Sequence, residues 1–349
     1  MRRGIQRPIA ALLAILFVTT PAVPQDAEVK ILPKGITQET KSAIDKALKF
    51  LAREQSKDGS WRSGGGYGYY PCAMTGLAGL ALIASGSTPT RGPYAKHVRK
   101  ATKYLLGQQQ ANGLISAPAE ESRSMYGHGF SLLFLSQVYG MEEDVSKQRR
   151  IKETCKRAIK LIERSQSRDG GWLYTPDSQG DEGSVTVTQI QALRGCRNAG
   201  IHVSKKCVDK AIRYIERSQS GDGGIRYSVR SSGSRPALTA AACAVLYNAG
   251  AYDSKISDRA WKYAWRTCQP NGGRSHGHYF YTQLYMSQAT WQKGDKYWQK
   301  YFPQIQKHLL STQQGNGSWR GDHVGLVYGS AIGLLILQIP YNKLPILSR

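Results

Sequence analysis

The sequence predicts an all-α protein: a closed double ring, or α/α toroid, of six helix pairs. Three observations predict this fold. A short glycine-containing turn recurs six times, an amphipathic segment precedes these turns, and an apolar, nearly uncharged segment follows each one. Because a helix that is apolar all round is buried and an amphipathic helix lies at a surface, each repeat supplies one inner and one outer helix.

The recurring turn begins with glutamine and reaches an Asp-Gly or Asn-Gly pair a few residues later. Its copies recur about every 50 residues, as expected of a helical repeat. They begin at Gln55, Gln109, Gln166, Gln219, Gln269 and Gln313, and a tryptophan completes three of them at Trp61, Trp172 and Trp319. Asp, Asn and Gly tolerate the left-handed conformation, so the pair ends the preceding helix.

The segments around the turns have the patterns of two helix layers. Apolar residues spaced by three and four predict outer helices, as in 43–51, 98–105, 158–162 and 211–215. The predicted inner helices are Ala73–Ser85, Gly129–Tyr139, Ser184–Ala199, Pro236–Ala249, Tyr279–Thr290 and Val324–Ile339. An open solenoid needs polar capping repeats, and the last inner segment is among the most apolar, so we expect the ring to close.

The N-terminus has the pattern of a secretory signal. Arg2, Arg3 and Arg7 precede an apolar run over residues 9–18, and small residues follow up to Ala22. We therefore expect a signal peptide over 1–22, a linker over 23–39 and the toroid over 40–345. The mature protein is then exported, either periplasmic or extracellular.

The formal net charge is +24, and it remains +21 without Arg2, Arg3 and Arg7 (24 − 3). Such a field favours anionic partners. Because export argues against nucleic acid, we expect an anionic membrane surface or envelope polymer. The alternative is that Lys and Arg coat the outer helix faces, as they do over residues 147–164.

Cysteines leave two interpretations open. The six are Cys72, Cys155, Cys196, Cys207, Cys243 and Cys268, and none shows metal-site spacing. Export permits disulfides, and the second, third and fourth cysteines are expected at one end of neighbouring helices. A single bridge among those three is one interpretation, and six buried, inert thiols are the other.

The Gln…Gly-x-Trp turn at this spacing resembles the repeat of squalene and oxidosqualene cyclases and of protein prenyltransferase β-subunits. The segments 126–130, 184–189, 278–281, 297–298, 328–329 and 339–341 further resemble secreted squalene-cyclase-like repeat proteins of bacteria. The resemblance covers about residues 40–345 and implies an α/α toroid whose central cavity binds isoprenoid chains. It also implies that the turn residues are structural: Gln55, Trp61, Gln109, Gln166, Trp172, Gln219, Gln269, Gln313 and Trp319.

The known chemistries of this fold do not carry over with the resemblance. The acidic Asp-x-Asp-Asp-Thr-Ala motif of squalene cyclases aligns with residues 182–186, where Ser184 occupies the protonating position and is better interpreted as a helix N-cap. The Asp-x-Cys pair of zinc prenyltransferases and the Cys-Gly-Glu-Gln of thioester domains are absent from the sequence. Whether the protein turns over a ligand stays open.

Aromatic and titratable residues are concentrated in the turns between outer and inner helices, which all lie at one mouth of the ring. Such groups around an apolar cavity are typical of a ligand site. The expected ligand contacts are Tyr70, Tyr126, His128, Tyr174, Tyr227, His278, Tyr279, Tyr281 and His323, and the expected catalytic residues are Glu182 and Asp181. No cofactor and no metal are predicted, although His276, His278, Asp322 and His323 belong to adjacent repeats.

Three functions are compatible with these features. The first is a lipophilic cavity that binds or processes an isoprenoid-like molecule. The second is an exported polysaccharide-active enzyme, for which Glu121 paired with Asp181 or Glu182 would supply the two carboxylates. The third is a non-catalytic interaction scaffold of the cell envelope, which the basic exterior favours.

Overall fold

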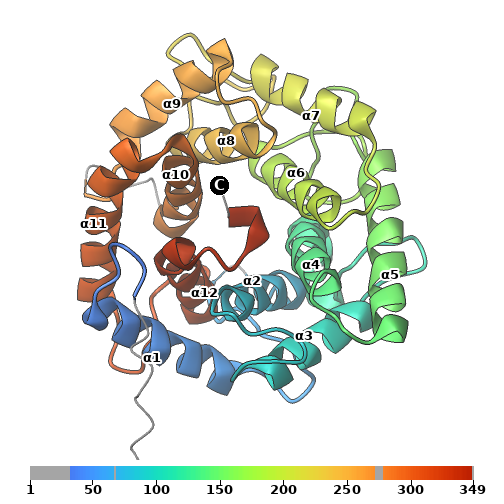
Figure 1. The fold of residues 1–349 in the computed structure, drawn as a ribbon. Coiled ribbons are helices and arrows are strands. Elements are labelled where there is room, and N and C mark those ends of the chain that lie inside the picture. The colour runs from blue at the N-terminus through green and yellow to red at the C-terminus, as the bar shows by residue number, and fades with distance from the viewer. Residues whose placement is uncertain (1–31, 67, 272–277, 348–349) are drawn as a thin grey trace, which may run out of the picture. The chain divides into compact units, whose positions relative to one another are not determined.

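The computed structural model describes residues 32–66, 68–271 and 278–347, and its compact unit begins at Pro33. Within the described residues, twelve α-helices and three short 3-10 helices form two concentric layers around a ring (Figure 1). The predicted α/α toroid is confirmed. The predicted signal peptide and residues 23–31 of the linker lie outside the described residues, so export stays a prediction.

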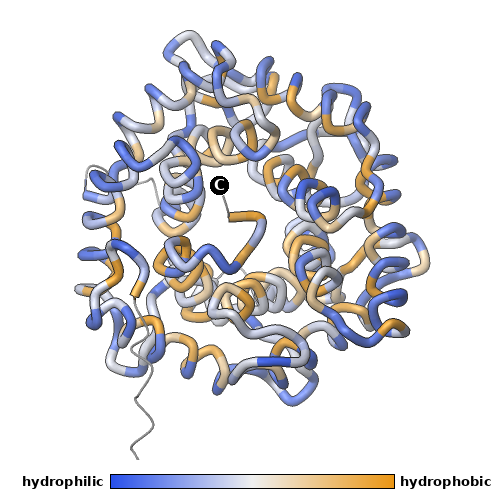
Figure 2. Tube along the Cα trace, in the orientation of Figure 1, coloured by the Kyte–Doolittle hydropathy of each residue, from blue (hydrophilic) through white to orange (hydrophobic). Residues whose placement is uncertain are grey.

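Amphipathic helices make up the outer layer, and their apolar stripes face the inner layer. In α1, for example, Ala43, Ala47 and Leu51 are buried, whereas Lys46 and Lys49 are exposed. Figure 2 shows the resulting alternation of hydrophilic and hydrophobic residues along the outer helices. The six are α1 (Gln38–Glu54), α3 (Ala95–Gly107), α5 (Val145–Arg164), α7 (Lys205–Arg217), α9 (Lys255–Thr267) and α11 (Asp295–Thr312).

The inner helices are buried on nearly all sides, as their composition predicts. Every residue of the first of them is buried. The six are α2 (Pro71–Ala84), α4 (Ser124–Tyr139), α6 (Gly183–Asn198), α8 (Pro236–Asn248), α10 (Tyr279–Lys293) and α12 (Leu326–Leu337), and the 3-10 helix η1 (Pro118–Arg123) leads into α4.

The ring closes between the first and last repeats. Helix α12 packs against α1 and α2 (Figure 1). The Gln313 side chain donates from Nε2 to the carbonyl oxygen of Ala43 at 2.9 Å, and Gln338 donates from Nε2 to that of Ala81 at 3.1 Å. The last repeat therefore takes the place that a capping unit would fill in an open solenoid, and the expected closure is confirmed.

The C-terminal segment crosses the ring at the end opposite the mouth. After α12 it forms η2 (Ile339–Tyr341) and η3 (Pro345–Leu347), and η3 packs against α6 on another side of the ring (Figure 1). Leu344, Ile346 and Leu347 are buried there. Because this segment follows the C-terminal end of an inner helix, it covers that end of the ring and leaves the mouth uncovered.

The glutamine of the repeat turn joins neighbouring repeats. In the third repeat, Gln166 donates from Nε2 to the carbonyl oxygens of Gly170 at 2.9 Å and Cys207 at 3.0 Å, so one amide bonds its own turn and the next outer helix. The same pair of bonds recurs at Gln55, Gln109, Gln219 and Gln313. Gln269, which follows α9, donates from Nε2 back to the Trp265 carbonyl oxygen of that helix at 2.7 Å.

Glycine and tryptophan complete the turn. Gly170 has a φ of +106°, and a Cβ there would lie 2.4 Å from the Lys210 carbonyl oxygen, so both backbone conformation and space require glycine. Trp172 is fully buried and donates from Nε1 to the Ile162 carbonyl oxygen at 2.8 Å. These contacts fasten the turn to the end of the outer helix and to the next repeat.

All six cysteines are free and buried in the structure. Cys155 and Cys196 are neighbours, and burial together with the adjoining Cys155 thiol raises the pKa of Cys196 well above its usual value. A thiol with a raised pKa is a poor nucleophile. The six thiols are thus buried and unpaired in the structure, and two of the three cysteines of the expected bridge, Cys155 and Cys196, lie next to each other.

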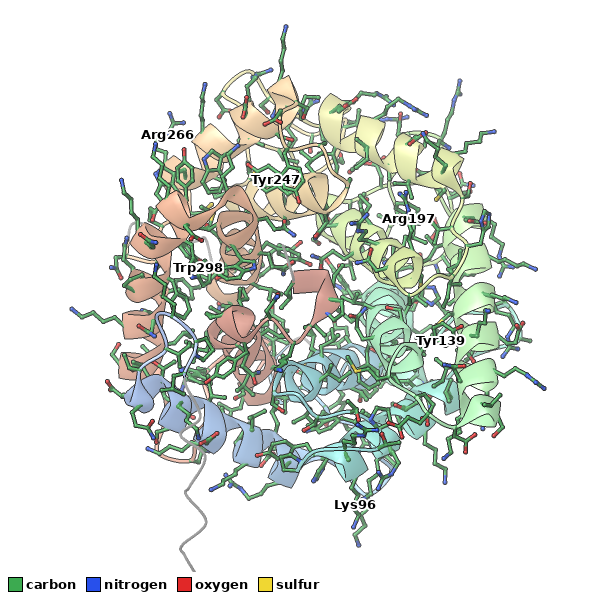
Figure 3. The ribbon with its side chains drawn as sticks, in the orientation of Figure 1. Lys96, Tyr139, Arg197, Tyr247, Arg266 and Trp298 are labelled. Atoms are coloured by element: carbon green, nitrogen blue, oxygen red, sulfur yellow. The ribbon has the colours of Figure 1, made fainter. Side chains whose placement is uncertain are left out.

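Basic side chains cover the outer face of the ring. Lys96 on α3 and Arg266 on α9 are exposed and point away from the inner layer (Figure 3). The membrane or envelope-polymer partner expected from this charge stays a prediction. Among the residues described, no helix combines the length and the apolar character that crossing a membrane requires.

Candidate functional site

A central cavity of about 580 Å³ lies at the mouth of the ring. Each of the six inner helices contributes lining residues from its first two turns, and the preceding loops add the remainder. The volume falls in the range of about 300–1,000 Å³ that is typical of small-molecule sites. The cavity is therefore a product of ring closure, since no single repeat forms more than one sector of it.

The floor of the cavity is apolar. Its residues lie on the inner helices, and several of them are one helical turn deeper than the residues at the mouth. The floor consists of Ala73, Met74, Leu77, Phe130, Leu238, Leu284 and Ile332. Apart from the thioether sulfur of Met74, which is a weak acceptor, no side chain in this set can hydrogen-bond, so the floor suits an apolar group.

Tyrosines surround the mouth above this floor: Tyr70, Tyr126, Tyr174, Tyr227, Tyr281 and Tyr328. Tyr174 and Tyr227 are hydrogen-bonded through their hydroxyl groups, although they belong to successive repeats. The rings of Tyr126 and Tyr174 have centroids 5.9 Å apart. Tyr126, Tyr174 and Tyr227 thus form a connected part of the aromatic rim.

Cationic groups stand beside the tyrosines. The Arg123 guanidinium lies 4.9 Å from the ring centroid of Tyr174, and Arg235 lines the cavity immediately before α8. His278, immediately before α10, also lines it, and burial with the nearby His323 lowers the pKa of His278. The two arginines are therefore the permanent positive charges of this mouth.

Glu182 is a buried carboxylate in the cavity wall and caps α6. Its oxygens accept hydrogen bonds from the backbone N–H groups of Ser184 at 3.0 Å and Val185 at 2.9 Å and from the Ser184 hydroxyl at 2.7 Å. The Ser184 hydroxyl is in turn bonded to Tyr126. Burial raises the pKa of Glu182, and these hydrogen bonds oppose the shift. The N-cap expected at Ser184 is thus Glu182, two residues earlier.

Asp322 is the second carboxyl group of the cavity lining. It comes from the loop before α12 but caps the neighbouring α10, where it accepts from the N–H groups of Tyr279 at 2.9 Å and Phe280 at 3.2 Å. Its own backbone is left-handed, with a φ of +49°. Burial raises the pKa of Asp322 to about 6, against the effect of these bonds.

Asp181 lies outside the cavity lining. The pKa of Tyr214 on α7 is raised by burial first and also by the adjacent Asp181, which places the carboxyl toward the outer layer. One Asp181 oxygen is buried without a hydrogen-bond partner, and the Cβ of this residue packs near Gly171. The adjacent acids Asp181 and Glu182 therefore point to different sides of the inner layer.

Glu121 is exposed and does not line the cavity, so the structure does not bring it together with Glu182 there. The preceding Glu120 is buried and accepts from the N–H group of Cys72 at 3.1 Å, which makes it a cap for α2. Burial raises the pKa of Glu120. Of the carboxylate pair expected for a glycan-active enzyme, Glu182 alone remains at the cavity.

His128 is fully buried behind the cavity. Its Nδ1 accepts from the Ile115 N–H group at 3.0 Å, and burial lowers its pKa to about 4. In the third repeat the Thr186 hydroxyl accepts from the Trp172 N–H group in the same way. His128 in the second repeat therefore corresponds to Thr186 in the third repeat. An alignment of the repeats with each other could have revealed this correspondence.

Two other expected ligand contacts also lie outside the cavity lining. The Tyr279 ring packs against His308 of α11, with centroids 4.7 Å apart, and its hydroxyl donates to the Pro270 carbonyl oxygen at 3.4 Å. His323 is exposed. Six of the nine expected ligand contacts line the cavity: Tyr70, Tyr126, Tyr174, Tyr227, His278 and Tyr281.

Asp322, Tyr328, Arg123 and Arg235 also line the cavity, although they are not among the expected ligand contacts. Their position just before or within the first turn of an inner helix is the signal that could have found them. His276 lies outside the described residues, and among those described no group of three His, Cys, Asp or Glu residues is placed to hold a metal ion.

Comparison with known sequences supports the resemblance seen in the repeats. The family model for the squalene-hopene cyclase C-terminal domain matches residues 7–172. Lanosterol synthase erg7A of Aspergillus fumigatus is 30% identical over 152 residues, which are 41% of this chain and 19% of the synthase. The chain thus matches a minor part of that relative, and its similarity to squalene-cyclase-like proteins is confirmed.

Solved structures share the fold. The type II terpene cyclase MstE from Scytonema, in complex with its substrate geranylgeranyl dihydroxybenzoate, has a TM-score of 0.58 and 15% identity, covering 88% of this chain and 98% of that one. An inactive variant of the α-1,6-mannanase GH76A of Salegentibacter, bound to α-1,6-mannotriose, has a TM-score of 0.62 and 10% identity, with 86% and 98% covered. These identities establish the fold alone.

Proposed function

We propose that the central cavity binds an amphiphilic, isoprenoid-like molecule, with its apolar chain on the floor and its polar head at the rim. The observation that carries this proposal is the division of one cavity into an apolar floor and a rim of tyrosines and arginines. We also propose, from the pattern of residues 1–22, that the protein acts outside the cytoplasm.

The floor would supply most of the affinity. Burial of apolar surface contributes about 25 cal/mol for each Å² removed from water. Leu77, Phe130, Leu284 and Ile332 offer such surface on four different inner helices. A flexible hydrocarbon chain can contact all of these sectors at once, whereas a polar ligand would lose its hydration there without gaining hydrogen bonds.

The rim would orient the polar head. Arg123 and Arg235 can donate charge-assisted hydrogen bonds, and the hydroxyl groups of Tyr174 and Tyr227 can donate or accept. A head with hydroxyl or carboxylate oxygens fits this set. The substrate named for MstE, which joins an isoprenoid chain to a dihydroxybenzoate head, supports this class of ligand, since that protein shares the fold.

The proposal is for binding and does not extend to cyclisation. An alkene is a very weak base, so its protonation needs a strong acid, and the raised pKa values of Glu182 and Asp322 make both of them weak acids. Both carboxyl groups also accept backbone hydrogen bonds at helix N-termini. Their role in this proposal is to hold the helices that carry the floor.

Native mass spectrometry of the full chain, and displacement of a fluorescent polyprenyl probe, test the proposal. Ala237 lies at the cavity in the first turn of α8, so Ala237→Trp fills the space without enlarging a packed core position. We expect this variant to lose probe binding. Val145→Trp is the matched control, because Val145 is 68% exposed on the outer layer and should leave binding unchanged.

Absence of probe binding to the unmodified chain would overturn the proposal, as would equal binding by Ala237→Trp and the control. A further variant, Arg123→Gln with Arg235→Gln, separates the two parts of the ligand. We expect this double variant to lower the affinity for probes with an acidic head and to leave the affinity for probes without a polar head unchanged. Thermal unfolding of each variant establishes that the fold is retained.

A second candidate function is glycan hydrolysis, which one observation favours. Two carboxyl groups, Glu182 and Asp322, line the same cavity, and the pKa of Asp322 is raised to about 6, as a general acid requires. The shared fold of the mannanase supports a cavity of this kind. Release of reducing ends from a panel of glycans, lost in Asp322→Asn, would establish this activity in place of lipid binding.

A further inference from the structure

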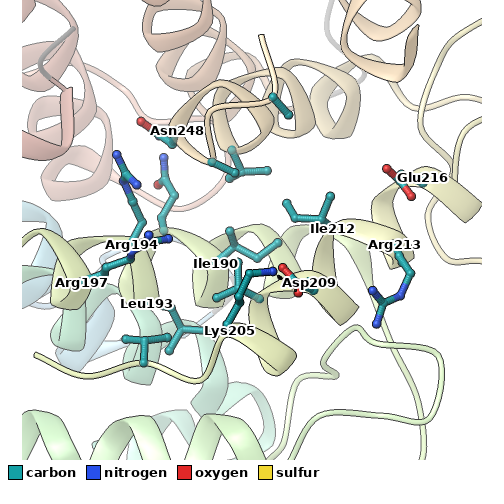
Figure 4. A pocket seen from close by; sticks show the side chains of 16 residues that line it. Ile190, Leu193, Arg194, Arg197, Lys205, Asp209, Ile212, Arg213, Glu216 and Asn248 are labelled. Carbon is teal, nitrogen blue, oxygen red and sulfur yellow. Dashed lines mark hydrogen bonds and ion pairs between the residues drawn. The ribbon is translucent and has the colours of Figure 1, made fainter. Parts of the chain in front are cut away.

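A second pocket of about 610 Å³ lies between α6, α7 and α8, and it shares no lining residue with the central cavity. Its residues come from the second half of α6, from α7 and from the end of α8 (Figure 4). It therefore opens on the other side of the inner layer, away from the mouth tyrosines. Its volume falls within the range that is typical of small-molecule sites.

The middle of this second pocket is aliphatic. Its wall is formed by Ile190 and Leu193 of α6, Val208 and Ile212 of α7, and Val245 of α8. Outer helices of the ring normally cover such side chains, but here the three helices leave space between them. Ile190, Leu193 and Val245 are buried, and Val208 and Ile212 are half-buried, so the wall of the pocket is apolar and suits a hydrocarbon chain.

One end of the pocket carries hydrogen-bond donors, of which the Arg197 side chain is exposed and the Asn248 amide is buried. Arg194, Arg197 and Asn248 are grouped there (Figure 4). Asn248 is 8% exposed; its Oδ1 accepts from Gln292 at 2.5 Å, whereas its Nδ2 is buried without a hydrogen-bond partner. A buried donor that lacks an acceptor is unfavourable, so an acceptor that enters the pocket would satisfy it.

The charge at this end is also unbalanced. The guanidinium groups of Arg194 and Arg197 form no ion pair with any residue that the structure describes. Lys205, in contrast, is paired with Asp209 at 2.6 Å, and the remaining carboxylate, Glu216, lies at the opposite end (Figure 4). Two cations beside an unsatisfied amide therefore create a receptor for an anion.

We propose that this pocket is a second ligand site, for a single-chain anionic amphiphile such as a long-chain carboxylate. The carboxylate accepts hydrogen bonds from Arg194, Arg197 and the Asn248 amide, and the chain lies along the aliphatic residues of α6 and α7. This site is independent of the ligand proposed for the central cavity. In this site the hydrocarbon chain of the ligand lies between the helices. Attraction of a lipid surface to the basic exterior of the protein would not require such a position.

The test uses the full chain and two probes of equal chain length, palmitate and neutral hexadecanol, with binding measured by calorimetry. We expect palmitate to bind more tightly than hexadecanol. Arg194→Gln combined with Arg197→Gln should weaken palmitate by about tenfold or more and leave hexadecanol unchanged, because charge-assisted bonds are lost. Asn248→Leu should weaken palmitate to a smaller extent.

Matched controls assign the effect to this pocket. Arg149→Gln with Arg150→Gln removes two exposed arginines from α5 and should leave palmitate affinity unchanged. Because the central cavity is also proposed to take a hydrocarbon chain with a carboxylate head, palmitate is titrated into Ala237→Trp as well, in which that cavity is filled. Palmitate binding that remains in this variant and depends on Arg194 and Arg197 belongs to the second pocket, so failure of the central ligand proposal is distinguishable from failure of this one. Thermal unfolding establishes that each variant is folded.

Three results would overturn the proposal. They are the absence of palmitate binding, equal palmitate affinity in the Arg194 and Arg197 double variant, and loss of palmitate binding in Ala237→Trp. Vesicles of phosphatidylglycerol provide a further arm. If they retain the chain through Arg194 and Arg197 while free palmitate does not bind, the arginines contact a membrane surface and the single-chain site is wrong.

Discussion

Each connection from an outer to an inner helix has two parts that differ in how much they vary. The repeat turn, such as residues 166–172, has the same amide-to-carbonyl bonds in the first four repeats and in the last. The mouth segment that follows, such as 173–182 or 320–325, differs in sequence in every repeat. The first part fixes the ring, and the second decides what the cavity presents.

This difference shows why the fold is shared more widely than the site. The repeat turn satisfies backbone groups at helix ends, a requirement that is the same in every helix pair. The mouth segment has no such requirement, so tyrosine, arginine or a carboxylate can occupy it. The predictions below test whether the two parts can be altered separately.

Loss of the turn tryptophan should have the largest effect. Trp172 is fully buried and bonded to the Ile162 carbonyl oxygen at 2.8 Å. Trp172→Ala should lower the free energy of unfolding by about 3–5 kcal/mol, because it leaves a cavity and an unpaired carbonyl. Chemical denaturation measures this change. Tyr69→Ala is the control from a mouth segment: Tyr69 is 63% exposed, and a comparable loss there would remove the distinction between the two parts.

The turn glycine should come next. Gly170→Ala places a Cβ 2.4 Å from the Lys210 carbonyl oxygen and forces alanine to a φ of +106°. We expect a loss of about 2 kcal/mol or more in unfolding free energy, from left-handed strain and displacement of α7. Gly221→Ala is the matched control, since a Cβ there meets no atom within 4 Å. Equal stability of both variants would contradict the packing role.

The turn glutamine should have an intermediate effect. Gln166→Ala removes two hydrogen bonds to backbone carbonyls and should destabilise the fold by about 1–2 kcal/mol. Among the described residues, Gln269 bonds the Trp265 carbonyl oxygen in its own repeat instead of the next outer helix, so the effect of Gln269→Ala on thermal unfolding should be smaller. The reverse order would indicate that joining neighbouring repeats is not the role of this amide.

The smallest predicted effect belongs to a mouth segment and depends on pH. The pKa of Asp322 is raised from 3.8 to about 6 by burial, so the folded protein binds this proton more tightly than the unfolded chain. Its contribution to stability is therefore fully present below about pH 4 and is lost as the pH rises toward 6, by about 1 kcal/mol after solvent screening.

Asp322→Asn removes this titration while keeping a residue that tolerates the left-handed backbone. The free energies of unfolding of the two proteins are measured between pH 4 and 7. We expect the unmodified protein to lose stability relative to Asp322→Asn as the pH rises. A constant difference over this range would show that Asp322 does not titrate as described.

The sequence by itself determined the layers and the ring. The 3.6-residue pattern of α5 and the uniform apolarity of α12 identify an outer and an inner helix, because burial acts on local composition. It also determined where aromatic groups gather, since the mouth segments are known once the turns are found. Six expected ligand contacts line the cavity for this reason.

Only the tertiary structure decided which of those residues share a space. Asp181 and Glu182 are adjacent in sequence but point to opposite sides of the inner layer, and His128 replaces a threonine of other repeats. Asp322 caps a helix of the preceding repeat. The pocket of Arg194, Arg197 and Asn248 joins two inner helices. The direction of a side chain and contacts between repeats depend on helix packing, which local sequence patterns do not specify.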